Sequence, residues 1–186
     1  MGVLLQIQMQ KSEGFTLGFY FQALSGVVGA PRQFFSDLPD PVGLRRPLGF
    51  LLVSSLFFAV ASFTCFRENH WLLSSIFLVN ALLMPFIAAG IAFMVMLLIV
   101  ERCMPFERLF AIYAFAGGVT LLVSWIPFSN WLTEPWKWIL IGLGMVKGGG
   151  LTWRQTILIL GLSLALLILL FRALFPVAAF LRELAS

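Results

Sequence analysis

Long apolar stretches separated by short polar breaks make up most of the chain between residues 47 and 175. About twenty residues of helix, rising about 1.5 Å each, cover the hydrocarbon layer of a bilayer, which is about 30 Å thick. Several of the stretches are this long, and most of the charged residues lie in the breaks between them. The pattern predicts an all-α fold, a polytopic transmembrane helical bundle.

The polar breaks divide this region into five predicted membrane spans, which cover residues 47–66, 71–100, 109–125, 136–146 and 152–171. The second span carries no charge and contains Pro85 near its middle. It is too long for one straight crossing and too short for two crossings with a turn. We therefore expect one long helix that is tilted or kinked at the proline. A re-entrant pair of helices is the alternative.

The N-terminal region is more mixed in character and contains no apolar run long enough for a span. Phe34 and Phe35 lie beside Arg32 in a short segment that is bounded by prolines. This arrangement predicts an N-terminal interfacial amphipathic helix at the level of the lipid headgroups. Packing of the same helix against protein is the alternative. The predicted organisation is a cytoplasmic or interfacial segment, a five-helix membrane domain and a short tail, over residues 1–46, 47–175 and 176–186.

Composition excludes a water-soluble globular domain. Hydrophobic residues make up 61% of the chain and charged residues only 11%, whereas soluble domains carry about 25% charged residues. The net charge is +4, but the sequence contains no basic run or basic helix. Nucleic acid is therefore not an expected partner.

The distribution of positive charge predicts the orientation. With the N-terminus in the cytoplasm, eight of the twelve Lys and Arg residues lie on the inner side, as the positive-inside rule requires. The C-terminus is then on the outer side. Arg45 and Arg46 directly precede the first span and can each attract anionic lipid by roughly 1 kcal/mol. The predicted lipid-interface residues are Arg32, Phe34, Phe35, Arg45 and Arg46.

The sequence offers little material for catalysis or metal binding. His70 is the only histidine, and it lies with Glu68 in a short polar break that suits a solvated turn. The serines within the spans lack a His or Lys at the same depth, which a serine hydrolase would need. Because the middle of each span holds no ionisable residue, proton-coupled transport is also disfavoured. We expect no enzyme activity, no metal and no cofactor.

A second group of residues within the spans suits helix packing or a groove. Glycine permits close approach of helices, and Asn80 is the strongest polar group at depth. An interhelical hydrogen bond is the plainer role for this amide, and a polar contact to a lipid or small solute is the other. The residues in question are Asn80, Pro85, Gly117, Gly118, Gly142 and Gly144.

The order of several motifs resembles the Yip domain family, in particular its bacterial branch. These motifs are a Pro-x-x-Phe-Phe segment (31–35), an Ile-Pro pair (126–127), an apolar run ending in Gly-Leu-Gly (138–144) and a Gly-Leu-Thr step (150–152). The resemblance covers about residues 31 to 172. It implies a bundle of five transmembrane helices with a cytoplasmic N-terminus and a periplasmic C-terminus in the bacterial inner membrane.

Eukaryotic members of that family bind small GTPases and influence membrane shape. The present chain lacks their long cytosolic N-terminal domain and their Asp-Leu-Tyr-Gly-Pro stretch, so small-GTPase binding is not carried over. We expect a non-enzymatic membrane-organising or scaffold protein whose partners are membrane lipids and a second copy or another membrane protein. The alternatives are a passage protein for lipids or small solutes, and an accessory subunit of a larger membrane complex.

Overall fold

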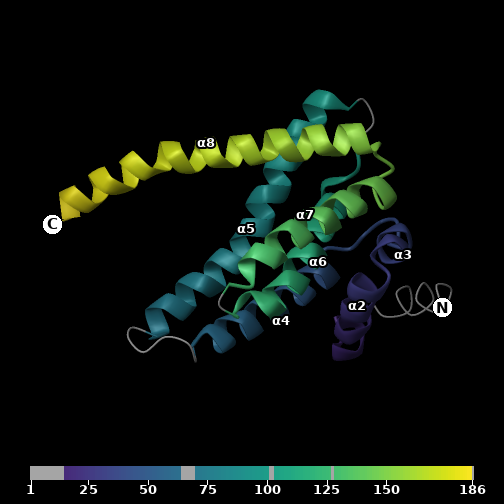
Figure 1. Cartoon of the computed structure of the whole chain (residues 1–186), viewed down its shortest axis with the longest axis horizontal. Helices are drawn as coiled ribbons and strands as arrows, with labels where there is room; N and C mark the ends of the chain where they lie inside the picture. Colours follow the sequence, from purple (N-terminus) through teal and green to yellow (C-terminus); the bar gives the residue numbers. More distant parts are fainter. Residues whose placement is uncertain (1–14, 64–69, 101–102, 127, 186) are drawn as a thin grey trace.

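Seven helices account for most of the part of the chain that the structure describes (Figure 1). The computed structural model describes residues 15–63, 70–100, 103–126 and 128–185. The helices are α2 (Leu17–Gly29), α3 (Pro31–Ser36), α4 (Arg45–Phe63), α5 (His70–Ile99), α6 (Phe106–Ser124), α7 (Asn130–Lys147) and α8 (Trp153–Ala185). No strand occurs within these ranges. The predicted all-α class is confirmed.

Four helices are long and apolar enough to cross a membrane: α4, α5, α6 and α8. They support a membrane-embedded protein. The helix α7 corresponds to the fourth predicted span, but its first turns contain Glu134, Pro135 and Lys137. It is not one of the four. The fifth crossing therefore remains a prediction.

The helix α5 is continuous over thirty residues, with Pro85 inside it. The prediction of one long helix is thus confirmed, and the re-entrant pair is not observed. Proline removes one backbone donor, which neighbouring groups in a membrane bundle can compensate. Pro85 lies against α6, because a Cβ atom added at Gly117 would be 3.6 Å from its Cγ atom.

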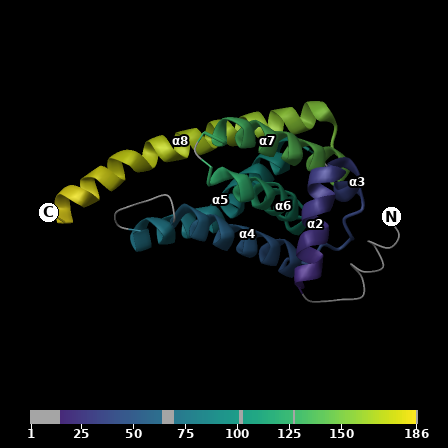
Figure 2. The same ribbon diagram turned by 60° about the horizontal axis from the view of Figure 1, so that its bottom comes forward.

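The helix α6 forms the centre of the bundle. Every residue from Leu109 to Thr120 is buried, as expected for a helix enclosed on all sides. It packs against α4, α5 and α7, and α2 also contacts it. Figure 2 shows α6 between α4 and α7.

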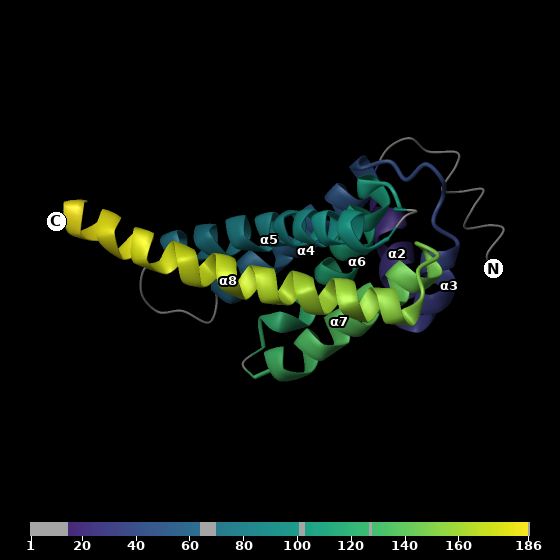
Figure 3. The same cartoon turned by 90° about the horizontal axis from the view of Figure 1, so that it is seen from above.

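The two ends of the chain differ from the sequence prediction. Near the N-terminus, Leu17–Gly29 form an apolar helix that was not predicted. Near the C-terminus, α8 continues to Ala185, where a short tail from residue 176 was expected. Alanine, leucine, arginine and glutamate dominate its last turns, and these residues favour helix. Figure 3 shows the C-terminal end of α8 extending beyond the other helices.

Candidate membrane-interface site

Positive side chains gather at one end of the bundle, which we call the basic end. Short connections between successive helices make them antiparallel neighbours, so α4, α6 and α8 begin at this end and α5 and α7 finish there (Figures 1 and 3). The helix α3 packs there against α7. Six described positive side chains lie at this end with three acidic ones: Arg32, Arg45, Arg46, Arg108, Lys147 and Arg154 with Asp37, Asp40 and Glu107.

The predicted lipid-binding arginines have two different environments. Arg32 and Arg45 are exposed at the basic end. Arg46 is partly buried, and its guanidinium carbon lies 5.3 Å from the centre of the Phe19 ring. This distance is typical of a cation–π contact. Arg46 therefore holds α2 against the start of α4, whereas Arg32 and Arg45 are accessible to headgroups.

The prediction that Phe34 and Phe35 insert into a leaflet is wrong. Both rings are buried within protein. Phe34 packs edge-to-face on Phe115 of α6, with 5.1 Å between ring centres. The helix α3 lies between α2 and α7, so neither ring is directed to the bilayer. The alternative interpretation, packing against protein, is the one that the structure shows.

Arg108 is an important residue that the sequence analysis did not identify. It is in the first turn of α6, and its Nη2 donates hydrogen bonds to the carbonyl oxygens of Leu38 (2.9 Å) and Pro39 (3.5 Å). Its Nη1 lies 3.7 Å from a carboxylate oxygen of Asp40. A single guanidinium thus ties the segment after α3 to the central helix.

We expect Arg108→Gln to lower the free energy of unfolding by about 1–3 kcal/mol, because two carbonyl groups lose a charged donor in a partly buried setting. The exposed ion pair contributes little of this. Thermal unfolding of the purified protein in detergent measures the change. Arg154→Gln removes an exposed arginine at the same end and is the matched control. Equal stability of the two variants would contradict the proposed anchoring role.

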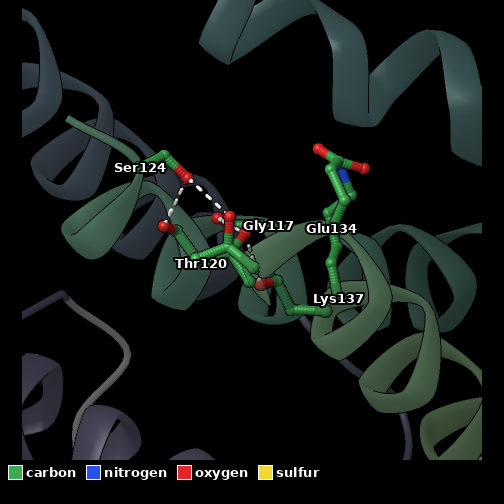
Figure 4. A network of polar contacts seen from close by, with 7 residues as sticks. Gly117, Thr120, Ser124, Glu134 and Lys137 are labelled. Carbon is green, nitrogen blue, oxygen red and sulfur yellow. Dashed lines mark hydrogen bonds and ion pairs between the residues drawn. The ribbon is translucent and has the colours of Figure 1, made fainter. Parts of the chain in front are cut away.

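A small polar network lies at the opposite end of α6 (Figure 4). The hydroxyl of Thr120 donates to the carbonyl of Gly117 (2.9 Å), and that of Ser124 donates to the carbonyl of Thr120 (2.8 Å). The Ser124 hydroxyl also lies 3.4 Å from that of Thr133 in α7. The first two bonds run to the preceding turn and satisfy each hydroxyl within α6. The contact between Ser124 and Thr133 joins α6 to α7.

Glu134 and Lys137 form an ion pair of 2.6 Å on α7 beside this network (Figure 4). The aromatic side chains nearby are exposed, and Phe128 and Trp131 have exposed fractions of 87% and 85%. Tryptophan is enriched at the membrane–water boundary. This end of the bundle has the composition of a second interface.

The structure brings most of the predicted packing residues to helix contacts. A Cβ atom at Gly118 would be 2.7 Å from the Phe50 ring, and one at Gly142 would be 3.3 Å from the Trp153 ring. Gly144 lies against Ile112 of α6. Asn80 does not join them, because its side chain is exposed. Neighbouring side chains occupy the space beside these three glycines, which favours the packing role over the groove.

The described residues contain no group of three or more His, Cys, Asp or Glu side chains that could hold a metal ion. Cys103 is a free thiol. Glu68 and the side chain of His70, which the sequence analysis assigned to a solvated turn, lie outside the residues described. Comparison of the chain with family models, curated proteins and solved structures gave no match. The resemblance to the Yip domain family rests on the residue patterns alone.

Proposed function

We propose that this chain is a non-enzymatic, Yip-type integral membrane protein of the bacterial inner membrane that organises lipid by binding anionic headgroups at its basic end. The observation that carries the proposal is the gathering of exposed positive side chains at this end of the bundle. In the proposed orientation, the N-terminus and the basic end face the cytoplasm, following the positive-inside rule.

Four positive side chains supply the proposed headgroup contacts: Arg32, Arg45, Lys147 and Arg154. All four are exposed, whereas Arg108 already binds backbone carbonyls and Arg46 lies over an aromatic ring. They come from α3, α4, α7 and α8. Each basic residue near an anionic surface contributes roughly 1 kcal/mol.

The helix α8 favours a second candidate, an accessory subunit of a larger membrane complex. Only one narrow face of its described part is buried, and it includes Ile159 and Leu167. The remaining faces expose large apolar residues, including Ile157 and Leu169. In a membrane, either lipid or another apolar helix covers such a surface. Native purification that recovers a stoichiometric partner chain would favour this candidate.

The test of the proposed function uses the full-length protein in neutral detergent. We expect phosphatidylglycerol to bind more tightly than phosphatidylcholine in a thermophoresis titration. The triple variant Arg32→Gln, Arg45→Gln, Arg154→Gln should lose this preference by about a hundredfold, from roughly 1 kcal/mol per residue and about 1.4 kcal/mol per factor of ten.

The matched control is Arg172→Gln, which removes an exposed arginine about 27 Å along α8 from Arg154. Its affinity for phosphatidylglycerol should equal that of the unmodified protein. Undiminished binding by the triple variant would overturn the proposal. A loss in the control variant as large as that of Arg154→Gln alone would show that net charge, rather than the basic end, determines binding.

A further inference from the structure

The helix α2 is apolar but too short to cross a bilayer. It has thirteen residues and is about 20 Å long, whereas a crossing needs about 20 residues. It contains no charged residue. Its axis runs across that of α4 instead of alongside it (Figure 2). A helix of this length that runs across a membrane-length helix lies in the plane of the membrane and not along its normal.

Contacts with α4 fix the depth at which α2 lies. Phe19 is under the guanidinium of Arg46, and the Tyr20 ring is 4.9 Å from that of Phe50. The Tyr20 hydroxyl is 3.2 Å from the hydroxyl oxygen of Ser54. The three α4 residues follow one another at intervals of four and extend over about 12 Å of helix. The helix α2 therefore lies beside the first three turns of a membrane-length helix, below the level of Arg45.

The residues of α2 fall into three sectors when they are placed at about 100° intervals around the axis. The first sector is buried against the bundle and contains Phe19, Tyr20, Ala23 and Val27. The second, which we call the outer stripe, contains Leu17, Phe21 and Val28, with exposed fractions of 67%, 64% and 55%. The third is small or polar and contains Gly18, Gln22, Ser25 and Gly29.

We propose that the outer stripe of α2 contacts the acyl chains of the leaflet at the basic end, while the polar sector faces the headgroups. Two observations select acyl chains as the occupant. Phe57 of α4 follows Ser54 by one turn, lies on the same face of α4 as Phe50 and is likewise exposed, so the apolar surface of this membrane-length helix continues beyond α2 on the same side. Arg32 and Arg45 are exposed nearby, where they would contact the headgroups of the same lipids.

This arrangement places an in-plane helix in the leaflet at the basic end, where its volume spreads the lipids of that leaflet. The inference deepens the proposed function and rests on the membrane setting of that proposal. The sequence analysis predicted that Phe34 and Phe35 contact lipid. The inference assigns this role to Leu17, Phe21 and Val28 instead.

Spin labels on the full-length protein test the inference. Single cysteines are introduced by Phe21→Cys, Val28→Cys and Ser25→Cys after Cys65 and Cys103 have been replaced by serine. The labelled proteins are reconstituted in phosphatidylcholine vesicles with and without phosphatidylglycerol. Collision with dissolved oxygen reports acyl chains, and collision with a water-soluble nickel chelate reports the aqueous phase.

We expect the ratio of oxygen to nickel accessibility to be several-fold higher at positions 21 and 28 than at position 25. High nickel accessibility at position 21 would show that the stripe faces water and would overturn the inference. Low accessibility to both reagents, with dipolar broadening between labels, would show that a second copy covers the stripe and would also overturn it.

The two proposals can fail separately. In one outcome, the outer stripe is inserted in pure phosphatidylcholine while the triple arginine variant still binds phosphatidylglycerol undiminished. This combination would support the in-plane helix and contradict the anionic-lipid function. Loss of lipid binding in the triple variant with a water-exposed stripe would give the reverse result.

Discussion

Replacing Phe35 by alanine should lower the free energy of unfolding by about 3–5 kcal/mol, the usual cost of deleting a buried aromatic ring. Phe35 is completely buried in the cluster that joins α3 to the bundle. The loss should appear as a large decrease in the unfolding temperature of the purified protein in detergent. The N-terminal segment should also become accessible to protease at lower temperature, because α3 loses its main contact.

Phe21→Ala is the matched control for this experiment. It deletes the same side chain from α2, but the Phe21 ring is 64% exposed, so the folded protein in detergent should lose little stability. Similar unfolding temperatures for the two variants would contradict the burial of Phe35. They would also favour the sequence-based prediction that Phe34 and Phe35 of α3 contact lipid.

The second large effect is expected for Gly144→Leu. A Cβ atom at this position would clash with the side chain of Ile112, which is fully buried and β-branched. Because χ1 of isoleucine is restricted, the strain must be relieved by moving α7 away from α6. We expect destabilisation by about 1–3 kcal/mol, the typical cost of overpacking a core, measured by thermal unfolding in detergent.

Gly161→Leu provides the control for Gly144→Leu. It makes the same change in an exposed part of α8, where nothing lies within 4 Å of the added Cβ atom. The variant should be as stable as the unmodified protein, because leucine favours helix over glycine. Destabilisation of the Gly161 variant alone would mean that the α6–α7 contact is not tight.

The membrane helices could be predicted because they depend on local composition. Uninterrupted apolar runs of the length of a bilayer indicate spans without knowledge of any partner. The predicted first, second and third spans lie within a few residues of α4, α5 and α6. The run around Pro85 favoured one long helix over a re-entrant pair, because no charged residue divides it and it is too short for two crossings with a turn.

The helix α2 was missed because its apolar residues form no run of span length, and its glycines are residues that commonly break a helix. Gly26 serves a different purpose: a Cβ atom there would be 2.8 Å from the Phe34 ring. Glycine at this position therefore permits α2 and α3 to pack closely, and the composition of the segment cannot distinguish this use from a break. The same limit applies to Phe34 and Phe35. Adjacent aromatic residues beside an arginine suit either a lipid surface or a protein core, and only the position of α7 decides.

Arg108 could not be identified from the sequence for a related reason. Its partners are carbonyl oxygens, which every residue possesses, and the Leu38 carbonyl is 70 residues away along the chain. An arginine at the start of a predicted span is ordinarily interpreted as an interfacial anchor. In the folded protein the segment after α3 lies close to Arg108, so this side chain links two segments that are distant in sequence.

This long separation has a consequence for biogenesis. Chains are synthesised at about 5–20 residues per second, so roughly 4–14 s elapse between the appearance of Leu38 and that of Arg108 at the ribosome. During that interval the N-terminal helices have neither their guanidinium tie nor the aromatic surface of α6. The helices α2 and α3 are therefore synthesised before their partners on α6. They can take their final positions only after α6 has been translated.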